Sequence, residues 1–378
     1  MCWHSIASHM PTQTFHSSAP VARRNVLKQI AAAAALLVPG INAVVAATPT
    51  EAASDLRARA VALLDASMAV DIHSHIGGTG PRRPVDDFTQ LKASGLSAVC
   101  MSLVSDSPVL ALENGKIIAK RQPAPGELRN FTLERLDFAD RMIADHGLKR
   151  ITTLADLQQS KANKTVGIIL ATEGADFLEG KLEQLDVLHT RGVRHFQLVH
   201  YRANNGLGDI QTEPATNHGA TPFGLDAVRA CNRLGMVVDV AHATFDAVKQ
   251  IAEVCSTPLI LSHTEWDAKP GHLSRRVNTE HAKLVAKTGG VVGIWTNAYN
   301  LPNAAAFAQG VARMAEVVGV DHVGIGTDKN GLPHPMMASY ADFPDMVAAM
   351  LHYFKEEELA KILGGNYLRV FGKATKVA

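Results

Sequence analysis

The chain has 378 residues, of which 47% are hydrophobic, and its 37 Lys and Arg residues balance 36 Asp and Glu residues to a net charge of +1. This is the composition of a soluble globular protein, and the length suits one large domain. The near-neutral charge and the 5% aromatic content give no basis for a nucleic-acid partner, which needs basic and base-stacking surfaces.

The N-terminal 47 residues have the pattern of an export signal. Arg23 and Arg24 precede an apolar run over residues 30–47, and the polar residues 48–50 follow it. We therefore expect residues 1–47 to be a twin-arginine signal peptide, which directs the protein to the periplasm or outside the cell. The run is too short and too interrupted to be a stable membrane anchor; the interrupting residues are Pro39, Gly40 and Asn42.

After residue 48 the sequence alternates between short apolar runs and amphipathic segments. The runs are rich in Val, Ile and Leu, as is typical of strands buried on both faces. Eight strands alternating with helices predict a TIM-like (β/α)8 barrel of parallel strands over residues 48–378. The runs are Met68–His73, Ala98–Val104, Val166–Glu173, Val193–His200, Met236–His242, Pro258–His263, Gly290–Trp295 and His322–Asp328.

Two helices have clear sequence signals. Thr221–Leu234 places its apolar residues on one face and ends at Gly235, and Phe245–Cys255 repeats the pattern. The long interval over residues 105–165 is expected to hold extra helices above the mouth of the barrel.

The four cysteines show no metal-binding or disulfide spacing. They are Cys2, Cys100, Cys231 and Cys255, without a CxxC motif. We interpret those of the mature chain as core thiols and not as ligands.

Six of the apolar runs end in residues that bind metals or transfer protons. Because active sites of such barrels lie at the C-terminal ends of the strands, these side chains are expected at one rim. Imidazole nitrogens and carboxylate oxygens suit Zn²⁺. Any one of them alone could be a hydrogen-bonded structural residue, a helix cap or the start of a turn. Core packing alone does not explain why six runs end in such residues. The residues are His73 with His75, Glu173, His200, His242, His263 and Asp328.

The spacing within the runs supports this interpretation. A strand points His73 and His75 to the same side. Gly324 and Gly326 share a face with Asp328 and are expected to leave room beneath its carboxylate. Asp71 is expected to support the site from deeper in the barrel or simply to begin the strand.

These motifs, in this order, resemble the membrane (renal-type) dipeptidases, the M19 metallopeptidases. The resemblance extends from about Val70 to Phe371. The matching segments are Asp71-Ile72-His73, Glu173-Gly174, Gln197-Leu198-Val199-His200, Asn232-Arg233-Leu234-Gly235, Asp239-Val240-Ala241-His242, Leu261-Ser262-His263, Ser274-Arg275-Arg276, Gly324-Ile325-Gly326-Thr327-Asp328 and residues 364–371.

The resemblance implies a zinc-dependent dipeptidase with two metal ions, in which a hydroxide shared by the metals attacks the peptide bond of a dipeptide. It assigns His73 to the first metal, Glu173 to both, and His242 and His263 to the second. It also implies that His200 contacts the substrate carbonyl and stabilises its oxyanion. Asp328 would transfer protons, and Arg276 would bind the substrate carboxylate. Arg275 remains an alternative, because the loop is longer than the family's usual one. The family relationship also allows a homodimer.

One residue departs from the family pattern. The family commonly has Asp two residues after its first His, where this chain has His75. We expect His75 to bind the first metal, in a site with one negative charge fewer. The change leaves two alternatives open: another metal-dependent amidohydrolase, acting on N-acyl amino acids, lactams or lactones, and an inactive peptide-binding barrel.

Overall fold

The computed structural model describes residues 49–78 and 87–376, and the expected signal peptide, residues 1–47, lies outside them. Within these residues, no helix combines the length and the hydrophobicity that a membrane span requires.

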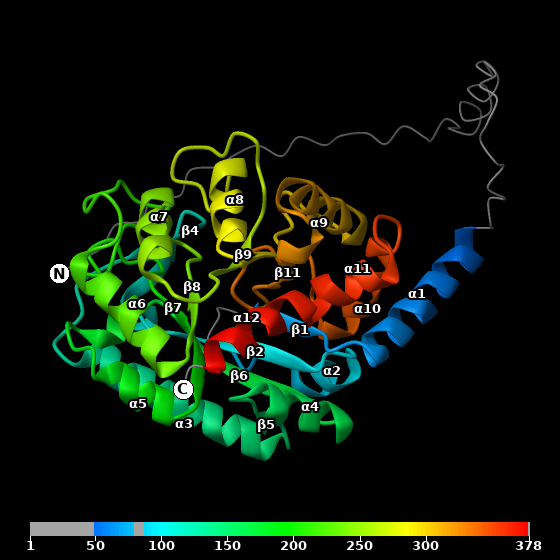
Figure 1. Cartoon of the computed structure of the whole chain (residues 1–378), viewed down its shortest axis with the longest axis horizontal. Helices are drawn as coiled ribbons and strands as arrows, with labels where there is room; N and C mark the ends of the chain where they lie inside the picture. The colour runs from blue at the N-terminus through cyan, green and yellow to red at the C-terminus, as the bar shows by residue number, and fades with distance from the viewer. Residues whose placement is uncertain (1–48, 79–86, 377–378) are drawn as a thin grey trace, which may run out of the picture. The chain divides into compact units, whose positions relative to one another are not determined.

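Eight parallel strands form the barrel that the sequence predicts. They are hydrogen-bonded side by side in the order β1-β2-β6-β7-β8-β9-β10-β11, and each coincides with one of the eight apolar runs, with β1 and β9 extending one residue beyond theirs. Figure 1 shows them surrounded by helices. The strands are β1 (Val70–Ser74), β2 (Ala98–Val104), β6 (Gly167–Glu173), β7 (Val193–Gln197), β8 (Val237–Asp239), β9 (Ile260–Thr264), β10 (Val291–Ile294) and β11 (Val323–Ile325).

The ends of β1 and β11 close the sheet into a barrel. Ser74 forms a parallel bridge with Lys329. The Asp328 N–H donates to the His73 carbonyl at 3.0 Å, and the His75 N–H donates to the Lys329 carbonyl at 2.9 Å. These bonds bring the chain after β11 against His73 and His75.

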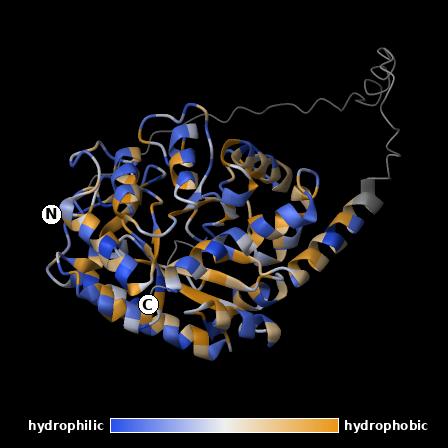
Figure 2. Ribbon diagram, in the orientation of Figure 1, coloured by the Kyte–Doolittle hydropathy of each residue, from blue (hydrophilic) through white to orange (hydrophobic). Residues whose placement is uncertain are grey.

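The helices pack around the strands with their apolar faces inward. The two helices predicted from sequence are confirmed as α6 (Pro222–Leu234), which starts at the Thr221 cap and ends at Gly235 with φ 69°, and α7 (Phe245–Val254). In Figure 2 the strands are mainly hydrophobic, and hydrophilic residues alternate along the helices around them. The other helices of the outer layer include α2 (Asp87–Ala93), α5 (Gln184–Thr190), α8 (Thr279–Lys287), α9 (Ala304–Val318) and α10 (Phe343–Met350).

The long interval between β2 and β6 differs in part from the prediction. It contains two helices, α3 (Glu127–Asp145) and α4 (Leu154–Ala162), where extra helices were expected, and also an antiparallel hairpin of β3 (Leu110–Glu113) and β4 (Lys116–Ala119). The alternation of such a short hairpin is too brief to stand out in sequence. A short strand, β5 (Lys149–Arg150), pairs with the start of β6, so the chain is already at the opposite end of the barrel when α4 begins, and α4 does not cover the mouth.

The C-terminal helix α12 (Asn366–Thr375) closes the N-terminal end of the barrel. Asn366 donates from its side chain to the carbonyls of Val320 and Val323 at 2.7 and 2.9 Å, just before and at the start of β11. Tyr367 and Phe371 pack into the apolar barrel interior. Because this end is plugged, substrate access is left to the C-terminal ends of the strands.

The three cysteines of the described chain carry free thiols. Cys100 and Cys231 are buried, as predicted for core thiols, and Cys255 is partly exposed.

Candidate metal centre

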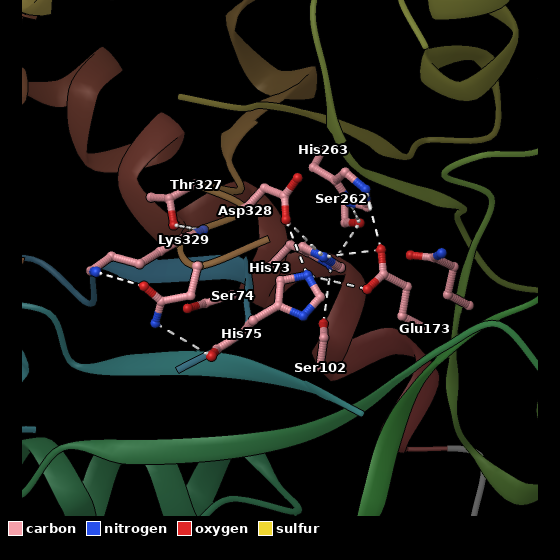
Figure 3. A network of polar contacts seen from close by, with 12 residues as sticks. His73, Ser74, His75, Ser102, Glu173, Ser262, His263, Thr327, Asp328 and Lys329 are labelled. Carbon is pink, nitrogen blue, oxygen red and sulfur yellow. Dashed lines mark hydrogen bonds and ion pairs between the residues drawn. The ribbon is translucent and has the colours of Figure 1, made fainter. Parts of the chain in front are cut away.

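The predicted polar residues converge at the C-terminal ends of six strands, and Figure 3 shows His73, His75, Glu173, His263 and Asp328 among them. All are buried, with at most 7% of the surface exposed. They reach this point because each follows or ends a strand of the same parallel barrel. His73 lies in β1 with His75 just beyond it, Glu173 ends β6, His200 and His242 follow β7 and β8, His263 lies in β9, and Asp328 follows β11.

Glu173 stands between two groups of potential metal ligands. The ligand atoms of His73, His75 and Glu173 lie within 4.8 Å of one another, and so do those of Glu173, His242 and His263. The Glu173 carboxylate is 3.4 Å from His73 Nε2 and 3.2 Å from His75 Nε2 on one side. On the other side it is 3.2 Å from His242 Nε2 and 3.6 Å from His263 Nε2. One carboxylate shared by two imidazole pairs is the arrangement of a two-metal site.

The chemistry of these groups fits bound cations. His73 Nε2 and Glu173 Oε2 are buried without a hydrogen bond. His242 Nε2 faces His263 Nε2 at 3.0 Å, which brings two imidazole nitrogens to one point. Two serine hydroxyls hold the outer ring nitrogens: Ser102 lies 3.1 Å from His73 Nδ1 and Ser262 lies 2.8 Å from His263 Nδ1. Such outer contacts fix the rings of metal-binding histidines with the other nitrogen toward the ion.

The electrostatics keep His242, His263 and Glu173 in the forms that metals bind. Burial, together with the Arg275 guanidinium, holds the pKa of His242 well below its usual range, and burial with the charges of His73 and Arg275 does the same for His263. Burial alone would raise the pKa of Glu173, but the surrounding histidines outweigh it and hold that pKa well below its usual value. Neutral imidazole and ionised carboxylate are the ligating forms.

Local backbone geometry directs two of the side chains into the centre. His242 and Asp328 have φ values of 68° and 53°, a left-handed conformation that is costly for residues other than glycine and that clusters at functional sites. Nearby, a Cβ on Gly331 would lie 2.1 Å from Asp328 Oδ1 and 2.5 Å from the His75 ring. The absence of a side chain at position 331 therefore makes room for both groups.

The room that the sequence predicts beneath Asp328 is filled. A Cβ added to Gly324 or Gly326 would lie 3.2 Å from the side chain of Ile72, and a Cβ on Gly326 would also lie 2.0 Å from the Ser262 carbonyl oxygen. Ile72 comes from the neighbouring strand β1 and Ser262 from β9, which the pattern of β11 alone does not reveal. The two glycines thus accommodate a core side chain and a backbone carbonyl.

Arg275, and not Arg276, reaches the centre. The buried Arg275 places Nη2 2.9 Å from His263 Nε2 and donates from Nη1 to the Gln211 side chain at 2.6 Å. Among the described residues no carboxylate pairs with it. Arg276 is directed away and pairs with Asp267. The Thr264 hydroxyl donates to the Arg275 carbonyl at 2.8 Å, which fixes the loop with Arg275 inward and favours Arg275, the alternative left open by the sequence, over Arg276.

Two further residues of the centre were not predicted. Asp106 Oδ1 lies 2.7 Å from His200 Nδ1, and Asp106 Oδ2 accepts the Tyr201 N–H at 3.2 Å. Asp106 follows β2 by two residues. The expectation that polar residues at the C-terminal ends of the strands form the site would therefore also have predicted Asp106. The Tyr201 ring packs against His200 and His242, with centroids 4.6 and 4.9 Å apart; its side chain carries no distinctive sequence signal.

Asp71 supports the centre and is not a ligand. Its carboxylate accepts hydrogen bonds from the Thr327 N–H and hydroxyl at 2.9 and 2.6 Å, and from the Tyr340 hydroxyl at 2.9 Å. These partners use its acceptor positions within the barrel wall. Asp71 therefore joins β1 to the chain after β11. Of the two roles that the sequence left open, this agrees with support of the site from deeper in the barrel and not with a residue that only begins the strand.

Known proteins resemble this chain in sequence and in fold. A family model described as membrane dipeptidase (peptidase family M19) matches residues 62–378. Dipeptidase tcpJ of Claviceps purpurea is 30% identical over 220 residues, which are 56% of this chain and 51% of that protein. The chain thus matches about half the length of this curated relative.

Two solved structures share the fold at lower identity. The probable dipeptidase PvdM of Pseudomonas aeruginosa has a TM-score of 0.74 and 20% identity, covering 86% of this chain and 100% of that one. A metallopeptidase of Rhodobacter sphaeroides, liganded with a phosphinate mimic of L-Ala-D-Ala, has a TM-score of 0.67 and 20% identity, covering 80% and 98%.

Proposed function

Because the chain belongs to the membrane dipeptidase family, peptidase family M19, we propose that it is a zinc-dependent dipeptidase. The observation that carries the proposal is the Glu173 carboxylate, shared by two groups of metal ligands beside a buried arginine without an ionic partner. An unpaired buried cation is costly, and the free carboxylate of a dipeptide would compensate it.

Five residues would hold two zinc ions. His73, His75 and Glu173 form one half, and Glu173, His242 and His263 form the other. Bound there, the ions would lower the pKa of a water molecule between them toward about 7 and polarise the scissile carbonyl.

The neighbouring residues would complete the reaction. Burial opposes a charge on His200, but the carboxylates of Asp106 and Glu173 outweigh it and raise the pKa of His200 well above its usual value. A cationic His200, held at Nδ1 by Asp106, would stabilise the negative oxygen that develops on the substrate carbonyl. Asp328 would accept the proton of the attacking water and pass it to the leaving amine. Arg275 would bind the substrate carboxylate by paired hydrogen bonds, which favours very short peptides.

Metal removal tests the proposal. Chelation of the purified chain is expected to abolish hydrolysis of a dipeptide panel, and zinc is expected to restore it at about two ions per chain. The panel should pair each dipeptide with its N-acetylated and C-amidated forms, and add N-acyl amino acids, lactams and lactones. Elemental analysis should accompany each assay.

The outcomes separate the alternatives. Loss of turnover on C-amidation would support carboxylate recognition. Preference for N-acyl amino acids, lactams or lactones over free dipeptides would replace the dipeptidase proposal by the amidohydrolase one. Two zinc ions without turnover of any compound would indicate a peptide-binding barrel.

We also propose that residues 1–47 export the protein by the twin-arginine route. The Arg23-Arg24 pair ahead of an apolar run supports this. Replacing both arginines by lysine is expected to leave the chain inside the cell, as fractionation would show; unchanged export would contradict the assignment.

A further inference from the structure

The strands that carry His242 and His263 have little direct pairing. β8 and β9 are joined in register at one position, Asp239 with Ile260. After Asp239 the chain leaves the sheet to turn His242 inward, at φ 68°. The relative position of these two imidazoles therefore depends on contacts other than the strand ladder.

The Asp239 carboxylate supplies such contacts. It is fully buried, and its Oδ1 accepts the N–H of Ala241 at 2.9 Å and the N–H of Ser262 at 3.1 Å. Each of these two residues directly precedes one of the histidines. One oxygen thus joins the end of β8 to the middle of β9, just beyond the last backbone bond between them, from the Val240 N–H to the Ile260 carbonyl at 2.7 Å.

The other oxygen of Asp239 is held by a buried chain of side chains. His195 Nε2 lies 3.0 Å from Asp239 Oδ2, and His195 Nδ1 lies 3.2 Å from the Tyr367 hydroxyl. Cys100 Sγ lies 3.2 Å from the same hydroxyl. A consistent set of donors has the tyrosine donating to Nδ1 and Nε2–H donating to the aspartate. This series of side-chain contacts links the C-terminal helix α12 to the metal centre.

Asp71 provides a matching device on the other half of the centre. Its Oδ1 accepts N–H groups of His73 at 3.3 Å and Thr327 at 2.9 Å, on β1 and after β11, while Tyr340 binds Oδ2. Each half of the centre thus has a buried aspartate that joins two segments carrying residues of the centre and is held by one tyrosine. Tyr340 contacts its aspartate directly, and Tyr367 acts through His195.

We propose that Asp239, oriented by His195 and Tyr367, is a positioning residue that sets the metal affinity of the His242/His263 half. The inference rests on the proposed two-metal centre. Loss of outer contacts of this kind typically lowers metal affinity by about 10–100-fold. The effect is expected at one of the two metal ions and not at both.

Zinc titration of the metal-free full-length chain by calorimetry tests this directly. Asp239→Asn keeps the size of the side chain but replaces the oxygen that faces His195 by an amide, and it is expected to weaken one of two zinc sites by about 10–100-fold. Tyr367→Phe removes only the distant hydroxyl, so a smaller weakening of the same site is expected. Tyr340→Phe is the matched control, because it removes one buried hydroxyl from the Asp71 side.

Combining Asp239→Asn with a variant that lacks one half of the metal centre identifies the half that Asp239 affects. In His263→Ala, which already lacks the second half, Asp239→Asn is expected to cause no further loss of zinc affinity. In His75→Ala, which lacks the first half, it is expected to weaken the remaining site. Tyr340→Phe is expected to show the opposite pattern.

Each outcome bears on a defined claim. If the unaltered chain binds no zinc, both the proposed function and this inference are wrong. If it binds two ions and Asp239→Asn binds both with unchanged affinity, the inference alone is wrong, even where the melting temperature of the metal-free variant falls. Equal loss at both sites would also overturn it, since that is the effect of general destabilisation.

Discussion

Replacing Asp328 by Asn is expected to lower kcat about 10²–10⁴-fold, the usual scale of general acid–base catalysis, while zinc content stays unchanged. The carboxylate follows β11 at a left-handed φ of 53° and enters the centre, 3.1 Å from His75 Nε2 and 3.8 Å from His73 Nε2. Asn preserves the shape and an acceptor oxygen but cannot take up and return a proton. Steady-state kinetics on a dipeptide, with elemental zinc analysis, would measure both effects.

Asp106→Asn is a matched control for this experiment. It makes the same change in a buried carboxylate whose Oδ1 lies 2.7 Å from His200 Nδ1. This carboxylate has no part in the proposed transfer of the proton from water to the leaving amine. We expect a smaller fall in kcat of about tenfold, because a hydrogen bond to a charged group exceeds a neutral one by about 1–1.5 kcal/mol. Full activity of Asp328→Asn would remove Asp328 from proton transfer, and loss of one zinc would make it a ligand.

The barrel could be predicted from sequence because its signals are local. Each buried strand is a short apolar run, and each intervening helix repeats its apolar residues on one face. Thr221 and Gly235 even marked the ends of α6, since the Thr221 side chain accepts the Gly224 N–H and Gly235 takes the left-handed conformation that ends the helix. The β3–β4 hairpin was missed because its strands are only four residues each, with one face exposed and no extended alternation.

The site was predictable where a residue's place in the chain decides its place in space. His73, Glu173 and His263 end or follow strands of a parallel barrel, and all such ends meet at one rim. The sequence could not decide between the two arginines because residues 275 and 276 lie in a loop, where neighbouring side chains point in different directions. Only the long-range contacts of Thr264 and Gln211 with Arg275 determine which one turns inward.

His75 shows how one substitution is accommodated in the centre. Its Nε2 lies 3.2 Å from Glu173 Oε2 and 3.1 Å from Asp328 Oδ1, so the imidazole has a carboxylate on each side. Both acids belong to the site whatever residue stands at position 75, so this half keeps two carboxylates beside the imidazole but has one negative charge fewer than the family pattern.

Arg275→Met is expected to lower kcat/KM for a free dipeptide by about 30- to 1000-fold, mainly through KM. Removing one partner of a buried, hydrogen-bonded charge pair costs about 2–4 kcal/mol, and each 1.4 kcal/mol is about tenfold. Met matches much of the volume and the flexibility of the arginine stem. The effect should nearly vanish with a C-amidated dipeptide, because that substrate has no carboxylate to lose.

Arg276→Met, one residue away, is the control that the structure selects. Arg276 is partly exposed and pairs with Asp267, and exposed ion pairs contribute about 0–1 kcal/mol, so kcat/KM should change less than about fivefold. A larger effect at Arg276 than at Arg275 would restore the assignment made from sequence. An equal effect of Arg275→Met on free and amidated substrates would show instead that the guanidinium acts on the metal centre through His263, which it approaches to 2.9 Å.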